Sequence, residues 1–131
     1  MGDFVRTSDP TTIVQRQLDA CNAHDVDALM AIYSDDVQHF EFPSTLVASG
    51  AAQVRERLSV RFQEPELHAR LVNRIAMGNL VIDQEVITRN FPGPDAGSQI
   101  GTIELIAMYE VSGERIVRAW FRFGQTLLGG P

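Results

Sequence analysis

The chain contains no lysine, and all eleven of its positive charges are arginines. Lysine is the residue that forms Schiff bases, and arginine cannot replace it because its guanidinium group stays protonated. The sequence therefore excludes Schiff-base chemistry. The formal net charge of −6 argues against nucleic acid as a partner, because contacts to phosphates need clustered positive charge.

Cysteine and long apolar segments are scarce as well. Cys21 is the only cysteine, so the chain can form neither an internal disulfide nor a thiolate metal cluster. No histidine spacing fits a zinc site, and there is no Gly-rich phosphate loop. No apolar run approaches the roughly 18–20 residues that span a bilayer, and the N-terminus lacks the pattern of a signal peptide. We expect a cytoplasmic protein with no metal, no cofactor and no membrane partner.

The 131 residues are enough for one domain with its own hydrophobic core. Residues 1–8 and 125–131 are predicted to be loose tails. The first half of the chain has apolar residues at helical spacing, whereas from residue 66 onward the period changes to two. Helices followed by long antiparallel strands indicate an α+β fold, with the helices covering one face of a curved sheet.

Three helices are predicted in the first half of the chain. The first begins at Asp9-Pro10, where the aspartate can cap the helix and the proline occupies its first position. Asp25 caps the second, whose apolar face extends to Tyr33. The third follows Gly50 and ends before Pro65. The apolar stripe of this helix is predicted to consist of Val54, Leu58 and Phe62. Its solvated side is predicted to carry Arg55, Glu56, Arg57 and Arg61.

A short strand over residues 37–42 separates the second and third helices, and residues 44–50 are predicted to be a loop. Strand alternation places His39 and Glu41 on one face and Phe40 and Phe42 on the other.

The second half of the chain is predicted to form two hairpins. Gly78-Asn79 fits a two-residue turn between strands at 66–77 and 80–91. This register produces three pairs on its charged face: Arg74 with Asp83, Val72 with Glu85, and His68 with Arg89.

The second hairpin covers about residues 100–124, and its turn can be drawn in two ways. A two-residue turn at Ser112-Gly113 would mix the faces, whereas a three-residue loop over 112–114 sorts charged and apolar groups cleanly. We therefore favour the loop. It sets these residues against each other: Ile103 with Phe123, Leu105 with Phe121, Ala107 with Ala119, and Tyr109 with Val117. The opposite face carries Ile106, Met108 and Trp120, an apolar stripe that favours a homodimer interface.

The order α-α-β-α-β-β-β-β and several short motifs resemble one known group of proteins. The motifs are NAHD between the first two helices, YSDD before the first strand, a proline at its end, and RAWFRFG near the C-terminus. Together they resemble the nuclear transport factor 2-like superfamily, in its SnoaL-like and ketosteroid-isomerase-like branch, over about residues 12–124. The resemblance implies a cone in which a curved antiparallel sheet wraps around three helices and encloses an apolar pocket. It also implies homodimers formed through the outer face of the sheet.

Ketosteroid isomerases in this branch need a carboxylate base just before a proline, and a phenol and a neutral carboxylic acid as hydrogen-bond donors. The base position falls on Glu41 when counted without a gap, or on Phe42 when aligned on Pro43. Gln17 occupies the position of the phenol and Ala107 that of the buried acid. Steroid isomerisation by that mechanism is therefore not expected.

Two groups of polar residues are candidates for chemistry. His39 and Glu41 could act as an acid–base pair at the pocket mouth, or they could form a solvent-facing edge while Phe40 and Phe42 pack inward. One face of the first predicted hairpin could line a polar pocket that holds a carboxylate-bearing ligand; it carries His68, Arg70, Arg74, Asp83, Glu85 and Arg89. Asp83 could instead be a base oriented by His68. We favour a third interpretation, ordinary ion pairs on a solvated face. The predicted catalytic residues are thus Glu41, His39 and Asp83. The predicted ligand-binding residues are Tyr33, Phe42, Phe62, His68, Tyr109, Phe121 and Phe123.

Two functional hypotheses follow, because this fold hosts both enzymes and binding proteins. The first is a cofactor-free isomerase, cyclase or hydrolase that acts on a small hydrophobic metabolite by carboxylate or histidine acid–base chemistry. The second is a non-catalytic domain that binds a small molecule or forms dimers. A titratable group on the pocket wall would favour the first hypothesis.

Overall fold

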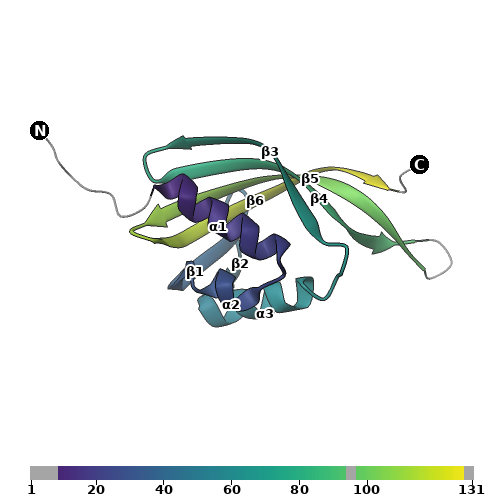
Figure 1. Cartoon of the computed structure of the whole chain (residues 1–131), viewed down its shortest axis with the longest axis horizontal. Coiled ribbons are helices and arrows are strands. Elements are labelled where there is room, and N and C mark those ends of the chain that lie inside the picture. Colours follow the sequence, from purple (N-terminus) through teal and green to yellow (C-terminus); the bar gives the residue numbers. More distant parts are fainter. Residues whose placement is uncertain (1–8, 94–96, 129–131) are drawn as a thin grey trace, which may run out of the picture.

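A computed structural model, which describes residues 9–93 and 97–128, shows a curved six-stranded sheet that wraps around three helices (Figure 1). The elements are α1 (Pro10–Asn22), α2 (Val26–Met30), β1 (Tyr33–Glu41), β2 (Thr45–Ser49), α3 (Ala51–Arg61), β3 (His68–Met77), β4 (Leu80–Pro92), β5 (Ser98–Ser112) and β6 (Arg115–Leu128). The strand order is β2-β1-β6-β5-β4-β3. Only β1 and β6 pair in parallel, and the other neighbours are antiparallel. The predicted α+β cone is confirmed.

The first helix begins as its sequence predicts, whereas the second is shorter. Asp9 caps α1 by accepting a hydrogen bond from the backbone N–H of Thr11 at 2.9 Å. The side chain of Asp25 caps α2 in the same way, but α2 ends at Met30. Tyr33 instead begins β1 and lies opposite Ile116 of β6. The prediction that Tyr33 ends the helix is wrong, because pairing with β6 outweighs the local helical pattern.

The predicted loop at 44–50 contains a strand. Thr45–Ser49 forms β2, which pairs with β1 and forms one edge of the sheet. The observed order is therefore α-α-β-β-α-β-β-β-β. A run of five residues is too short to display a period, so only its pairing with β1 identifies it.

The β3–β4 hairpin turns at Gly78-Asn79 as predicted, and Arg74 lies opposite Asp83. Beyond that pair, a β-bulge between Leu71 and Asn73 adds one residue to β3. The predicted partners farther along the strands are therefore wrong. The observed pairs there are Leu71 with Glu85 and His68 with Thr88.

Both registers drawn for the β5–β6 hairpin are wrong. Ser112 pairs with Arg115 around a turn at Gly113-Glu114, and an irregularity between Glu110 and Val111 shifts the strands by one more residue. The observed pairs are Leu105 with Phe123, Ala107 with Phe121, and Tyr109 with Ala119. They differ from the favoured register by two residues, so the sorting of side chains into two faces is preserved.

Two further expectations are wrong: one concerns where the last strand ends, and the other concerns which face of β4 points into the core. Residues 125–128 belong to β6 and not to a loose tail, while 1–8 and 129–131 lie outside the described residues. The face of β4 that carries Asp83 and Glu85 points into the core, and both residues are buried. The favoured prediction of a solvated face is therefore wrong, because α1 packs against this part of the sheet. Of the helices in the described ranges, none is long and apolar enough to cross a membrane.

Candidate functional site

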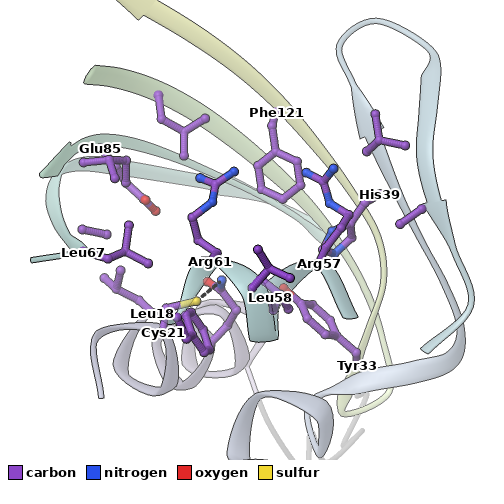
Figure 2. Close-up of a pocket in the computed structure, with 18 of the residues that line it drawn as sticks. Leu18, Cys21, Tyr33, His39, Arg57, Leu58, Arg61, Leu67, Glu85 and Phe121 are labelled. Carbon is purple, nitrogen blue, oxygen red and sulfur yellow. Dashed lines mark hydrogen bonds between the residues drawn. The ribbon is translucent and has the colours of Figure 1, made fainter. Parts of the chain in front are cut away.

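A cavity of about 730 Å³ lies between the inner face of the sheet and the helices α1 and α3 (Figure 2). Pockets that bind small molecules have similar volumes, roughly 300–1,000 Å³. Most of the wall is apolar. Its apolar residues include Leu18, Leu58, Phe62, Leu67, Ile87, Leu105 and Phe121.

Glu85 places a carboxyl group in this apolar wall. It lies on the inner face of β4, is 4% exposed, and points toward the cavity (Figure 2). Among the described residues, its Oε2 atom has no hydrogen-bond partner. Burial, then the charge of Asp83 and a hydrogen bond shared with it, raise the pKa of Glu85 from 4.5 to about 7, while the charge of Arg74 partly opposes this.

Asp83, two residues earlier on the same face, has a different environment. It is fully buried, and its two carboxylate oxygens accept hydrogen bonds from Nε and Nη2 of Arg74 at 2.6 and 2.9 Å. Nη1 of Arg74 also donates to the side chain of Gln15 at 2.8 Å. Asp83 is not among the residues that line the cavity, and His68 is exposed and does not line it either. The structure therefore does not bring together the predicted Asp83–His68 pair.

His39 is buried in the cavity wall, 2% exposed. Its ring lies edge-on against Tyr33 and Phe121, with centroid distances of 5.2 Å in both cases. Burial, followed by the charge of Arg57, lowers the pKa of His39 from 6.5 to about 4, so the ring is neutral near neutral pH. Within the described chain, its Nε2 atom has no hydrogen-bond partner. A ligand could therefore bind this atom.

The end of β1 decides between the two predicted orientations of the strand. Glu41 lines the cavity with His39, although its side chain is exposed. Phe42 is 45% exposed and does not line the cavity. Phe40 also lines the cavity, and it follows an irregularity in the strand between His39 and Phe40. His39 and Glu41 thus lie at the cavity as the first orientation predicts, whereas of the two phenylalanines in the alternative only Phe40 does.

Most of the predicted ligand-binding residues lie at the cavity. The structure places five of the seven on its wall, namely Tyr33, Phe62, Tyr109, Phe121 and Phe123, whereas Phe42 and His68 lie elsewhere. Burial raises the pKa of both tyrosines well above 10, so both keep their hydroxyl protons.

The structure also shows where Gln17 and Ala107 lie, the two residues at the positions of the hydrogen-bond donors of ketosteroid isomerases. Gln17 lines the cavity and donates from Nε2 to the sulfur of Cys21 at 3.1 Å, while its buried Oε1 atom has no partner among the described residues. Burial raises the pKa of Cys21 to about 12, so the thiol is not a nucleophile. Ala107 is buried and offers no polar group.

Four charged residues that line the cavity were not among the predicted site residues: Glu56, Arg57, Arg61 and Glu85. Glu85 shares its strand face with Asp83, so alternation could have identified it once that face was known to point inward. Glu56, Arg57 and Arg61 were assigned to the solvated side of α3, but all three line the cavity. Arg57 and Arg61 follow the buried Val54 at i+3 and i+7, a spacing that places them on the same helix face.

A curved sheet that wraps around three helices and leaves a mostly apolar cavity between them is the cone-shaped fold of nuclear transport factor 2-like proteins. The family model of the SnoaL-like domain matches residues 14–119. The chain belongs to this SnoaL-like family, and the resemblance drawn from the sequence is confirmed.

Several solved structures have the same fold. An uncharacterised cystatin-fold protein from Novosphingobium aromaticivorans is 24% identical, with a TM-score of 0.78 over 87% of this chain and 97% of its own. IdmH from Streptomyces antibioticus, described as a candidate polyketide cyclase, is 17% identical, with a TM-score of 0.75 over 88% and 92%. A candidate polyketide cyclase from Xanthomonas campestris is 22% identical, with a TM-score of 0.71 over 88% and 90%. No match was found among curated proteins.

Proposed function

We propose that the protein is a cofactor-free enzyme that uses Glu85 to transfer a proton on a small hydrophobic metabolite bound in the cavity. The observation that carries this proposal is the buried Glu85 carboxyl group, which faces the cavity with one oxygen unpartnered among the described residues. With a pKa of about 7, this group is present in both protonation states near neutral pH. Such a group can both accept and return a proton during a reaction.

The chemistry that fits best is proton abstraction next to a carbonyl group. The Glu85 carboxylate would take a proton from that carbon, and the electron pair would move onto the carbonyl oxygen as an enolate. Return of the proton to another atom gives an isomer. Attack of the enolate carbon on a second carbonyl of the same molecule instead forms a carbon–carbon bond and closes a ring; the π bond of that carbonyl breaks, and the resulting alkoxide takes back the proton held by Glu85. Cyclase activity also agrees with the names of two similar structures. The neutral His39 ring, if its Nε2 atom carries the proton, can donate a hydrogen bond to the developing oxyanion.

Glu85 is favoured over the two carboxylates predicted from the sequence. The carboxylate of Asp83 is held by two hydrogen bonds from Arg74 and does not reach the cavity. Glu41 is at the cavity but exposed, so water competes for its charge. The alternative of a non-catalytic binding domain predicts a pocket wall without a titratable group, and Glu85 counts against it.

A generic proton-transfer probe tests this function without knowledge of the substrate. A nitrobenzisoxazole ring opens when a base removes its carbon-bound proton, because the N–O bond breaks and a coloured nitrophenolate forms. We expect the wild-type protein to accelerate this reaction with a pH–rate profile that rises through about pH 7. Glu85→Gln should reduce the rate at least tenfold, since a general base typically contributes about 10²–10⁴-fold.

The matched control is Glu66→Gln, which removes an exposed carboxylate outside the cavity. This variant should keep the wild-type rate and profile. Equal rates for the wild-type protein and Glu85→Gln would show that Glu85 is not the base.

We further propose that the protein forms a homodimer through the outer face of the sheet. Ile106 on this face is 42% exposed, and Met108 and Trp120 are half-buried. Ile75 and Val72 on β3, two strands away from β5, are exposed too. Exposed apolar side chains on a sheet face favour association.

A further inference from the structure

Two arginines on α3 point into the cavity. Arg57 and Arg61 are four residues apart, so their side chains leave the same side of the helix one turn apart. Figure 2 shows the Arg61 guanidinium group in the space between Glu85 and Phe121, and that of Arg57 beside His39. Both groups therefore face the space that a ligand would occupy.

Neither guanidinium group has an anionic partner within the described ranges. Four other arginines, Arg55, Arg74, Arg89 and Arg118, each form an ion pair with a carboxylate. Glu41 and Glu56 also line the cavity, yet no ion pair joins either of them to Arg57 or Arg61.

Arg61 is half-buried, whereas Arg57 is exposed at the edge of the cavity. Burial, then the nearby charge of Arg89, lower the pKa of Arg61, while Glu64 partly opposes this. Glu64 itself is paired with Arg89 at 3.3 Å. The charge of Arg57 lowers the pKa of Arg61 as well. An anion bound between Arg57 and Arg61 would therefore stabilise both cations.

We propose that the cavity takes a ligand that carries a carboxylate, which Arg57 and Arg61 bind, with its apolar body against Phe121. The planar guanidinium group matches a carboxylate with two parallel hydrogen bonds. The apolar wall can cover the rest of the ligand. The carboxylate thus defines a substrate class for the cavity that contains Glu85. The proposal rests on the proposed function only in stating that the end of the ligand near Glu85 reacts.

A carboxylate fits this site better than a phosphate. Phosphate sites typically add backbone N–H groups at the start of a helix. Arg57 and Arg61 lie in the second half of α3, whose N–H groups are already used within the helix. The C-terminal end of a helix also disfavours a doubly charged anion.

A pair of probes of equal size tests the proposal. Naphthoate carries a carboxylate and naphthamide is its neutral counterpart, and the affinity of each is measured by calorimetry at pH 7.5. We expect the wild-type protein to bind naphthoate at least about tenfold more tightly, as charge-assisted hydrogen bonds are about twice as strong as neutral ones. The double variant Arg57→Gln/Arg61→Gln should lose this preference and still bind naphthamide.

Arg55→Gln is the matched control, since it removes the same charge from the same helix but at a residue that pairs with Asp27 and does not line the cavity. It should keep the preference for naphthoate. Added phenyl phosphate should displace naphthoate weakly if the site selects carboxylates.

Several results would overturn the proposal. They are equal affinity for the two probes, binding of neither probe, stronger binding of phenyl phosphate than of naphthoate, or an equal loss of preference in the Arg55 control. Glu85→Gln should retain the preference for naphthoate, because it alters the proposed base and leaves both arginines in place. A failure of the carboxylate site is therefore distinguishable from a failure of Glu85 as the base.

Discussion

Replacing Glu85 with glutamine should change how the stability of the fold depends on pH. The glutamine amide has nearly the same shape as the protonated acid, and it can donate a hydrogen bond to Asp83 as that acid does. It carries no charge at any pH. The variant therefore resembles the wild-type protein at low pH, where Glu85 is protonated in both the folded and the unfolded chain.

The sign of the effect follows from the pKa of Glu85, which is raised from 4.5 to about 7 in the folded protein. Below pH 4.5 the carboxyl is protonated in both states and costs nothing. As the pH rises to about 7, the unfolded chain loses its proton first, so the wild-type protein loses stability. One pKa unit corresponds to about 1.4 kcal/mol, so the loss over this window is on the order of 3 kcal/mol. Because Glu85 is almost fully buried, little of this is screened by solvent.

His39 contributes an opposite slope in nearly the same pH range. Its pKa is lowered from 6.5 to about 4 in the folded protein, so stability falls as the pH decreases from 6.5 to 4. The wild-type curve alone would therefore show only the balance of two effects. The difference between Glu85→Gln and wild type removes the His39 contribution, because both proteins contain that residue.

The assay is urea unfolding at a series of pH values from 4 to 8.5, followed by the fluorescence of Trp120, the only tryptophan. We expect the unfolding free energy of Glu85→Gln, relative to that of the wild-type protein, to increase by about 3 kcal/mol between pH 4.5 and 8. Glu66→Gln, an exposed control, should stay within about 0.5 kcal/mol of wild type throughout. A difference for Glu85→Gln that stays constant with pH would refute the reasoning.

Three further predictions concern other parts of the structure. Arg74→Met should lower the unfolding free energy by about 3–5 kcal/mol in urea, because it leaves the buried Asp83 charge unpaired, and an equally stable variant would contradict this. In the same urea series, His39→Phe should abolish the loss of unfolding free energy that His39 causes between pH 6.5 and 4, which is on the order of 3 kcal/mol. An unchanged dependence on pH in this range would argue against it. Ile106→Asp should convert a dimer into a monomer in sedimentation experiments, and a monomeric wild-type protein would exclude the proposed interface.

Local signals in the sequence were sufficient for much of the fold. The cap at Asp9-Pro10 and the turn at Gly78-Asn79 depend on a few neighbouring residues, and both are found where predicted. The bulges near Val72 and Glu110 were missed because they adjust the twist of neighbouring strands to each other. Such adjustments depend on the assembled sheet and leave no local sequence pattern.

The site was predictable to the extent that alternation fixes which residues share a face. It correctly grouped His39 with Glu41, and Asp83 with Glu85. It could not decide which face points inward, because a face with several charges resembles a solvated surface. Arg61 was missed for the same reason, since an arginine beside an apolar helix stripe is usually solvated.

The contrast between Asp83 and Glu85 links the fold to the proposed chemistry. Strand alternation brings two carboxylates to one buried face. Of the two arginines on β3, Arg74 binds Asp83, and both of its hydrogen-bonding edges are engaged. The fixed charge of Asp83 then raises the pKa of Glu85 further than burial alone would. At neutral pH this arrangement costs stability that an amide at position 85 would not. Groups whose environments separate their pKa values in this way are typical of acid–base sites. The location of Glu85 on the cavity wall would bring its carboxyl group next to a ligand bound in the cavity, as the proposed function requires.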